Sequence, residues 1–173
     1  MKTLISADEV QAAVAQLAAT IENEYRGKPL TIVGVLTGSL MLLADLVRHI
    51  DLPLKIGLIQ ASSYRGKATR AERLAINVSL TPDLTGRHVL LIDDIFDTGH
   101  TLAGLLEQLS HGNVASLKSA VLLWKEGRQE VEIVPDHHCF KIPDQFVVGY
   151  GLDYDDEYRN LPYVAVLEEK DCG

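Results

Sequence analysis

Apolar residues recur at helical spacing near the start of the chain. They would share one face of a helix: Val10, Val14, Leu17 and Ile21. Ser6 and Glu9 have the spacing of a capping box, in which each side chain bonds the backbone of the other residue. Gly27 and Pro29 then interrupt the pattern. The sequence therefore predicts an amphipathic helix that begins after Ser6 and ends before Gly27.

A strand, a helix and a second strand follow in succession. Residues 31–36 are apolar and β-branched, which is typical of a strand covered on both faces. After a turn at residues 37–39, a second apolar stripe predicts a helix that ends near Pro53: Leu43, Leu46, Val47 and Ile50. Residues 54–60 then have the composition of a strand. This is one β-α-β unit, the building block of a parallel sheet.

The second half of the chain continues the alternation. Strands are predicted at residues 74–80, 89–92 and 114–124, with a turn at residues 82–86. A helix is predicted from Thr98 to the break at residues 111–113, and its buried stripe is formed by leucines: Leu102, Leu105, Leu106 and Leu109. Residues 62–73 are small, polar and basic, so we expect a mobile loop that closes over bound substrates.

These elements predict an α/β protein with a mostly parallel central sheet flanked by helices. The chain contains no internal repeat and no linker, so residues 1–173 are expected to form one domain. The rhythm breaks after Pro135. We therefore expect a small appended subdomain, the hood, built mainly from residues 135–173.

Composition narrows the functional classes. The chain of 173 residues has a formal charge of −8, which argues against a nucleic-acid or anionic-lipid surface. No stretch has the apolar length of a signal sequence or membrane span. Cys139 and Cys172 are the two cysteines, and their spacing favours neither a disulfide framework nor a metal site. We expect a cytoplasmic protein without nucleic-acid or membrane partners.

Candidate chemistry concentrates after the predicted strand at residues 89–92. Asp93 and Asp94 end this strand, where ligands of open α/β sheets bind. Carboxylates suit ribose hydroxyls and the magnesium ion that accompanies a pyrophosphate. The amides of residues 98–101 open the next helix and suit a phosphate. Asp97, Thr98 and Gly99 could instead merely cap that helix, but two carboxylates at the end of an apolar strand are costly without a partner. The stretch predicts a phosphoribose site.

At these residues the sequence resembles the type I phosphoribosyltransferases, whose signature is an apolar run, two acids, two apolar residues and Asp-Thr/Ser-Gly-x-Thr. Many members have Glu where this chain has Asp93. The resemblance implies that the ribose 5-phosphate and its hydroxyls contact one continuous set of residues: Asp93, Asp94, Asp97, Thr98, Gly99, His100 and Thr101.

Further segments resemble one branch, the hypoxanthine-guanine phosphoribosyltransferases, from about residue 33 to residue 167. Residues 36–39 resemble its pyrophosphate loop and residues 62–66 its flexible lid. Arg159 matches an arginine that contacts pyrophosphate. The resemblance thus implies the following pyrophosphate-binding residues: Thr37, Gly38, Ser63, Tyr64 and Arg159.

The same resemblance implies where the base binds. Lys125 matches a lysine that donates a hydrogen bond to the purine 6-oxo group. The 6-amino group of adenine is itself a donor and cannot accept that bond. Phe146 matches an aromatic residue that stacks on the purine, and the backbone of Val147 matches one that meets the purine edge. Asp153 is also implied to belong to the purine-binding residues and, with Asp93 and Asp94, to hold Mg²⁺.

The resemblance implies an enzyme of purine salvage. It would transfer the 5-phosphoribosyl group from 5-phosphoribosyl 1-pyrophosphate to hypoxanthine or guanine, giving IMP or GMP and pyrophosphate. Asp97 would accept or relay the N7 proton of the base, and Asp93 and Asp94 would face the positive charge that develops on ribose. A homodimer or homotetramer is expected.

Three alternatives remain at this point. A regulatory protein could retain the fold and bind nucleotides or RNA without efficient catalysis. A pyrimidine or orotate enzyme would share the phosphoribose site but should lack the run at residues 146–150. A xanthine-preferring enzyme differs only in its recognition of C2, because hypoxanthine, guanine and xanthine all present a 6-oxo group.

Overall fold

The computed structural model describes residues 1–64 and 73–168. Helices and strands alternate through most of the chain. The elements are β1 (Lys2–Ile5), α1 (Ala7–Tyr25), β2 (Leu30–Leu36), α2 (Leu40–Arg48), β3 (Leu54–Tyr64), β4 (Arg73–Asn77), β5 (His88–Phe96), α3 (His100–Ser110), β6 (Ser116–Lys125), β7 (His137–Ile142), β8 (Val147–Val148) and β9 (Val164–Val166).

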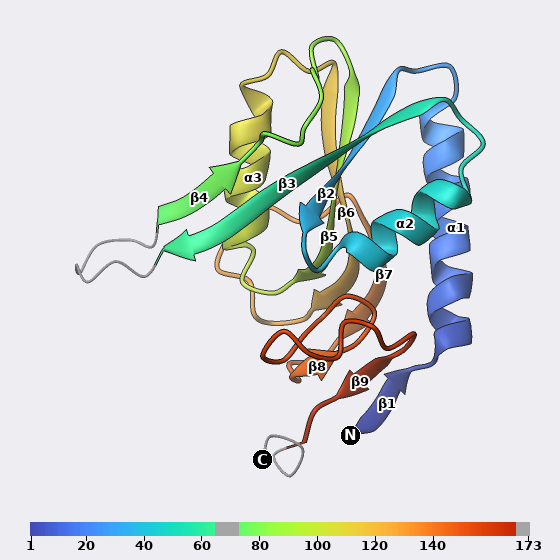
Figure 1. The fold of residues 1–173 in the computed structure, drawn as a ribbon, viewed down its shortest axis with the longest axis vertical. Coiled ribbons are helices and arrows are strands. Elements are labelled where there is room, and N and C mark those ends of the chain that lie inside the picture. The colour runs from blue at the N-terminus through green and yellow to red at the C-terminus, as the bar shows by residue number, and fades with distance from the viewer. Residues whose placement is uncertain (65–72, 169–173) are drawn as a thin grey trace.

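The main sheet has six strands in the order β4-β3-β2-β5-β6-β7. All neighbours are parallel except β3 and β4, which are antiparallel. The carboxyl ends of β2, β5 and β6 therefore meet at one edge of the sheet. Figure 1 shows this edge facing the smaller sheet. The mostly parallel sheet that the sequence predicts is confirmed.

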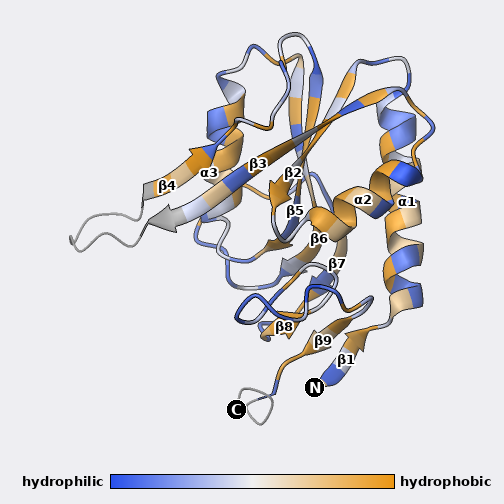
Figure 2. Cartoon of the chain, viewed as in Figure 1, coloured by the Kyte–Doolittle hydropathy of each residue, from blue (hydrophilic) through white to orange (hydrophobic). Residues whose placement is uncertain are grey.

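The two faces of the main sheet form two cores. Alternate residues of the central strands, such as Ile32 and Ile92, pack with α1 and α2, whereas Val33 and Leu91 pack with α3. Successive side chains of a strand point to opposite faces, so a strand covered on both sides is apolar throughout. Figure 2 shows apolar residues along the central strands and mixed polarity on the helices.

Helix α1 begins as its capping box predicts. The Ser6 amide donates to Glu9 Oε2 at 2.8 Å, and the Glu9 amide donates to Ser6 Oγ at 3.3 Å. These bonds satisfy amides that have no partner inside the helix. Within residues 1–64 and 73–168, no helix has the length and apolar character needed to cross a membrane.

A smaller sheet lies beside the carboxyl edge of the main sheet. Its order is β1-β9-β8, and both pairings are antiparallel. The expected hood at residues 135–173 differs from this arrangement in two ways. Strand β7 extends the main sheet instead, and β1 comes from the other end of the chain. A strand of four residues is too short for a periodic signal, so β1 has no signature in the sequence.

Several predicted boundaries were wrong. Strand β5 continues through both acids to Phe96, with Asp93 paired opposite Val121 in β6. Strand β3 continues to Tyr64 and β4 begins at Arg73, so the ends of the expected loop are paired strands. Backbone ladders extend these strands through polar residues, which an apolar pattern cannot mark. Residues 65–72 lie outside the described part. Strand β4 also ends at Asn77, short of the predicted residue 80.

Candidate active site

A pocket of about 260 Å³ lies at the carboxyl ends of β2 and β5. It is enclosed by the turn after β2, the end of β5 and the start of α3. Its lining brings together many of the predicted site residues: Gly38, Asp93, Asp94, Asp97, Thr98, Gly99 and Thr101. The topology therefore collects the expected phosphoribose-binding residues in one place.

Asp93 and Asp94 are adjacent carboxylates in a poorly solvated position. Asp93 is 8% exposed. Burial, reinforced by the charge of Asp94, raises the pKa of Asp93 well above its ordinary value. Burial also raises the pKa of Asp94, although hydrogen bonds from Asp93 and Ile95 and the charge of Arg159 oppose the effect. Such a pair is stabilised when a hydroxyl or a cation reaches it.

The turn after β2 rests on Asp94. A methyl group built on Gly38 would lie 1.8 Å from Asp94 Oδ2, so only glycine leaves room for the carboxylate. The Leu36–Thr37 peptide is cis. Ser39 anchors the turn, because its Oγ donates to the Val35 carbonyl at 2.7 Å. The predicted pyrophosphate loop thus touches the predicted ribose site.

The segment predicted to bind phosphate leads into the N-terminus of α3. The helix begins at His100, two residues later than predicted, because Gly99 has the left-handed φ of 89° and forms the N-cap. The first amides of a helix have no intrahelical partner and bind anions. A side chain at Gly99 would meet Val131 at 2.3 Å. His100 points outward, where its Nε2 lies 2.7 Å from Glu130 Oε2.

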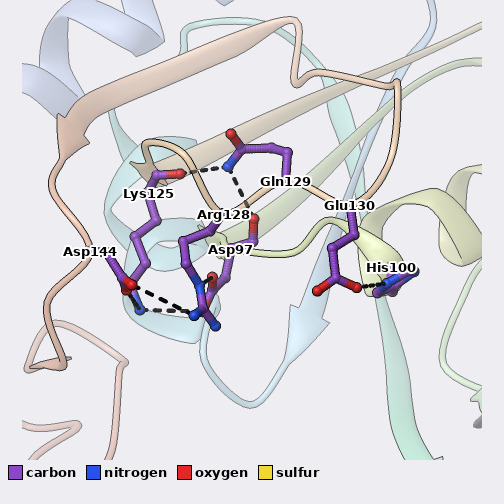
Figure 3. Close-up of polar contacts among 7 residues, drawn as sticks. All are labelled: Asp97, His100, Lys125, Arg128, Gln129, Glu130 and Asp144. Atoms are coloured by element: carbon purple, nitrogen blue, oxygen red, sulfur yellow. Dashed lines mark hydrogen bonds and ion pairs between the residues drawn. The ribbon is translucent and has the colours of Figure 1, made fainter.

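Lys125, the residue predicted to bind the base, is the last residue of β6. Its side chain is 9% exposed, and Nζ lies 3.2 Å from Asp97 Oδ2 and 3.6 Å from Asp144 Oδ1. Asp97 also receives a hydrogen bond from Arg128 Nε at 3.0 Å (Figure 3). The two residues expected to contact the base, Lys125 and Asp97, are therefore direct neighbours.

The turn after β6 joins this cluster to the phosphate segment. Gln129 Nε2 donates to the Lys125 carbonyl at 2.5 Å and to the Asp97 carbonyl at 3.1 Å. The Glu130 amide donates to the Thr98 carbonyl at 2.9 Å. These bonds fix the turn against the end of β5.

The aromatic side of the base region is open. Phe146 is 54% exposed, and its ring meets the Tyr154 ring edge to face, with centroids 5.8 Å apart. Val147 lies in β8, opposite Val166 of β9. An exposed ring beside a polar site can stack on a planar ligand. The structure therefore leaves Phe146 accessible for the predicted contact with a purine.

Arg159 reaches back toward the pyrophosphate loop. Its Nη1 donates to the Gly151 carbonyl at 2.7 Å, and its Nη2 lies 2.9 Å from Asp153 Oδ1. A methyl group on Gly151 would lie 2.0 Å from the Gly38 carbonyl oxygen, so the two backbones touch. Arg159, Asp153 and the loop thus form one neighbourhood.

Several outcomes differ from the sequence interpretation. Ser63 and Tyr64 end β3, and the rest of the expected lid, residues 65–72, lies outside the described part. The sequence interpretation missed Arg128, Gln129 and Asp144. They lie in irregular segments, where polar residues are common and no periodic pattern singles them out.

The donor set near Asp94 suits Mg²⁺ in one particular way. Within residues 1–64 and 73–168, no three His, Cys, Asp or Glu side chains gather as a metal site. Mg²⁺, however, is commonly held by one or two carboxylates together with substrate phosphates and water. The desolvated pair Asp93 and Asp94 fits that requirement, whereas Asp153 forms an ion pair with Arg159.

Paired acids at the carboxyl edge of the sheet, next to a helix N-terminus, are the features that the sequence predicts for a phosphoribose-binding site. The family model of the phosphoribosyl transferase domain matches residues 6–155. The chain is 44% identical to the hypoxanthine-guanine phosphoribosyltransferase of Streptococcus pneumoniae (strain ATCC BAA-255 / R6), over 98% of this chain and 94% of that relative. This chain belongs to the hypoxanthine-guanine phosphoribosyltransferase family.

Two further comparisons agree. The hypoxanthine phosphoribosyltransferase of Haemophilus influenzae is 44% identical, over 96% of each chain. A crystal structure of a hypoxanthine phosphoribosyltransferase from Staphylococcus aureus has a TM-score of 0.92 at 39% identity, covering 98% of this chain and 92% of that one. The predicted fold class, family and transferase class are confirmed, and the regulatory alternative is not favoured.

Proposed function

We propose that the protein transfers the 5-phosphoribosyl group of 5-phosphoribosyl 1-pyrophosphate to hypoxanthine or guanine, with IMP or GMP and pyrophosphate as products. The observation that carries the proposal is the contact between Lys125 and Asp97, because Asp97 lines the same pocket as Asp93 and Asp94. Lys125 would donate to the 6-oxo group of the base. Asp97 would accept the N7 proton.

Different residues of the pocket would bind the 5-phosphate, the ribose and the pyrophosphate of the substrate. The amides at the start of α3 would bind the 5-phosphate, and Asp93 and Asp94 would bind the ribose hydroxyls. The residue 37–38 backbone and Arg159 would hold the pyrophosphate as it leaves. Catalysis would come chiefly from positioning and from charges already oriented toward those that develop.

Asp93 and Asp94 would hold Mg²⁺, with Asp153 as a further candidate ligand. The ion would neutralise negative charge on the pyrophosphate. The same carboxylates would stabilise the positive charge that develops on the ribose ring. We also propose a cytoplasmic homodimer or homotetramer, since two cysteines without the spacing of a disulfide framework suit a reducing compartment and symmetric association is the common state of such enzymes.

Base preference tests the proposal directly. A steady-state assay of pyrophosphate release with hypoxanthine, guanine, xanthine and adenine should show use of 6-oxopurines and little use of adenine. Loss of a charged hydrogen bond from Lys125 costs roughly 1.5–3 kcal/mol, so we expect at least about a tenfold difference. Equal use of adenine and hypoxanthine would show that Lys125 has been assigned the wrong role. Xanthine use would measure the discrimination at C2.

A further inference from the structure

The cluster at the base end of the pocket is a closed ring of alternating charges. Lys125 contacts Asp97 and Asp144, as described above. Arg128 contacts the same two acids: Nε lies 3.0 Å from Asp97 Oδ1 and Nη1 lies 3.6 Å from Asp144 Oδ2. Figure 3 shows the four side chains converging from three separate segments. Two positive and two negative groups make the ring neutral.

The two cations of the ring differ in their surroundings. The Lys125 side chain is 9% exposed, while those of Asp97, Arg128 and Asp144 are 34%, 44% and 54% exposed. A buried ammonium depends on its neighbours more than an exposed guanidinium does, because water cannot replace a lost partner. Arg128 is nevertheless held in place, since the adjacent Gln129 bonds the carbonyls of Asp97 and Lys125.

This arrangement creates a competition for Lys125. To bind a 6-oxo group, Nζ must direct a donor at the base, although two carboxylates attract it. Arg128 shares both carboxylates, so it reduces the negative charge that bears on Lys125. Without Arg128 the ring would carry one net negative charge, and the single remaining cation would be held by two acids.

We propose that Arg128 is a positioning residue for the purine base: by sharing Asp97 and Asp144, it leaves Lys125 available to the 6-oxo group. The inference rests on the proposed function and adds a specific role within it. Asp144 is the second acid that competes for Lys125. Its carboxylate contacts both cations, and the residue belongs to neither β5 nor β6.

Substitutions that change and then restore the net charge of the ring test this role. Arg128→Gln should raise the KM for hypoxanthine about tenfold, the scale of one charged hydrogen bond, while the KM for 5-phosphoribosyl 1-pyrophosphate stays nearly constant. Arg128→Lys should restore most of the loss. Adding Asp144→Asn to Arg128→Gln makes the ring neutral again, so the double variant should have a lower KM for hypoxanthine than Arg128→Gln alone.

The control is Arg26→Gln, which removes an exposed arginine paired with Glu22 in α1 and should leave both KM values unchanged. Thermal melts verify that each variant is folded. If the unmodified protein converts 6-oxopurines but Arg128→Gln keeps the same base KM, or the double variant is no better than Arg128→Gln, the role of Arg128 is wrong. An unmodified protein that converts no 6-oxopurine contradicts the proposed function itself, and this inference with it.

Discussion

At the scale of single residues, the site contains two buried carboxylates in positions that do not favour folding. Asp93 and Asp94 follow one another in a central strand, and burial raises the pKa of both carboxyls. Their backbone contacts are local: the Asp94 amide donates to Asp93 Oδ1 at 2.9 Å and the Ile95 amide to Asp94 Oδ1 at 2.7 Å. The buried charges of this pair therefore oppose folding, which is consistent with the ligand-binding role proposed above.

Asp94→Asn should separate these two contributions. The amide keeps the shape of the side chain and removes its charge, so the free energy of unfolding should be unchanged or higher. The kcat/KM for 5-phosphoribosyl 1-pyrophosphate should fall by roughly a hundredfold, the scale of one lost electrostatic contact in an active site. Urea unfolding and steady-state kinetics measure the two effects.

The matched control is Asp51→Asn, a change at an exposed acid outside the pocket. It should alter neither quantity. An Asp94→Asn variant that unfolds, or one that retains full activity, would remove Asp94 from the proposed site.

The sequence reveals some of these residues and conceals others for a physical reason. Asp93 and Asp94 stand out because acids rarely end an apolar strand, whereas Lys125, at the end of β6, was identified only through the family resemblance. Arg128 and Asp144 lie in irregular segments, where charged residues are ordinary. Only the folded chain shows that both approach Asp97 and Lys125.

At the scale of helices and strands, prediction succeeded where periodicity is strong. Helix α1 has a regular apolar stripe and a capping box, and it was predicted closely. Strands β1 and β7 were not assigned correctly. Strand β1 is short, and β7 is an edge strand whose partly exposed residues have no clear alternation. Its membership of the main sheet depends on pairing with β6, a contact that no local pattern encodes.

A polar junction ties β7 and β6 to the end of α1. Glu24 Oε1 accepts a hydrogen bond from Lys118 Nζ, and Glu24 Oε2 lies 3.0 Å from His137 Nε2. Burial alone would raise the pKa of Glu24, but Lys118 and His137 outweigh it and lower the pKa. Because the carboxyl has a lower pKa in the folded state, its stabilisation is present above its unfolded pKa and is lost as pH falls through the folded value.

Glu24→Gln should therefore destabilise the protein in a pH-dependent way. Lys118 is 42% exposed, so solvent screening limits the expected loss to about 1 kcal/mol or less at neutral pH. The difference from the unmodified protein should shrink as the pH falls below about 4.3. Urea unfolding at several pH values tests this, with Glu107→Gln on the exposed side of α3 as the control. An equal loss at every pH would mean that packing, not charge, explains the effect.

At the scale of the whole molecule, the residues of the proposed site come from both sheets. The main sheet and the segment that follows β5 carry the acids, and β6 carries Lys125, while Val147 lies in β8, Phe146 directly before it and Arg159 between β8 and β9. Figure 1 shows the smaller sheet beside the carboxyl ends of the main sheet's strands. The two parts touch where Gly151 meets Gly38. The carbonyl of Gly151 also accepts a hydrogen bond from the Arg159 guanidinium. One backbone contact therefore relates the arginine to the pyrophosphate loop.

Gly151→Ala tests whether this contact sets the geometry of the site. Gly151 has a φ of 102°, and an added methyl group would lie 2.0 Å from the Gly38 carbonyl oxygen. The loop and the Arg159 segment must then move apart. We expect kcat/KM for 5-phosphoribosyl 1-pyrophosphate to fall on the order of a hundredfold, as a displacement of about 1 Å can cause.

Gly86→Ala supplies the matched control. Gly86 also has a positive φ, 70°, but a methyl group there meets nothing within 4 Å. Both variants should lose about 1–3 kcal/mol of stability through backbone strain, and only Gly151→Ala should also lose activity. Thermal melts and kinetics on the two proteins distinguish strain from displacement. If Gly151→Ala loses stability but keeps its kcat/KM, the contact between the sheets supports the fold without positioning the pyrophosphate-binding groups.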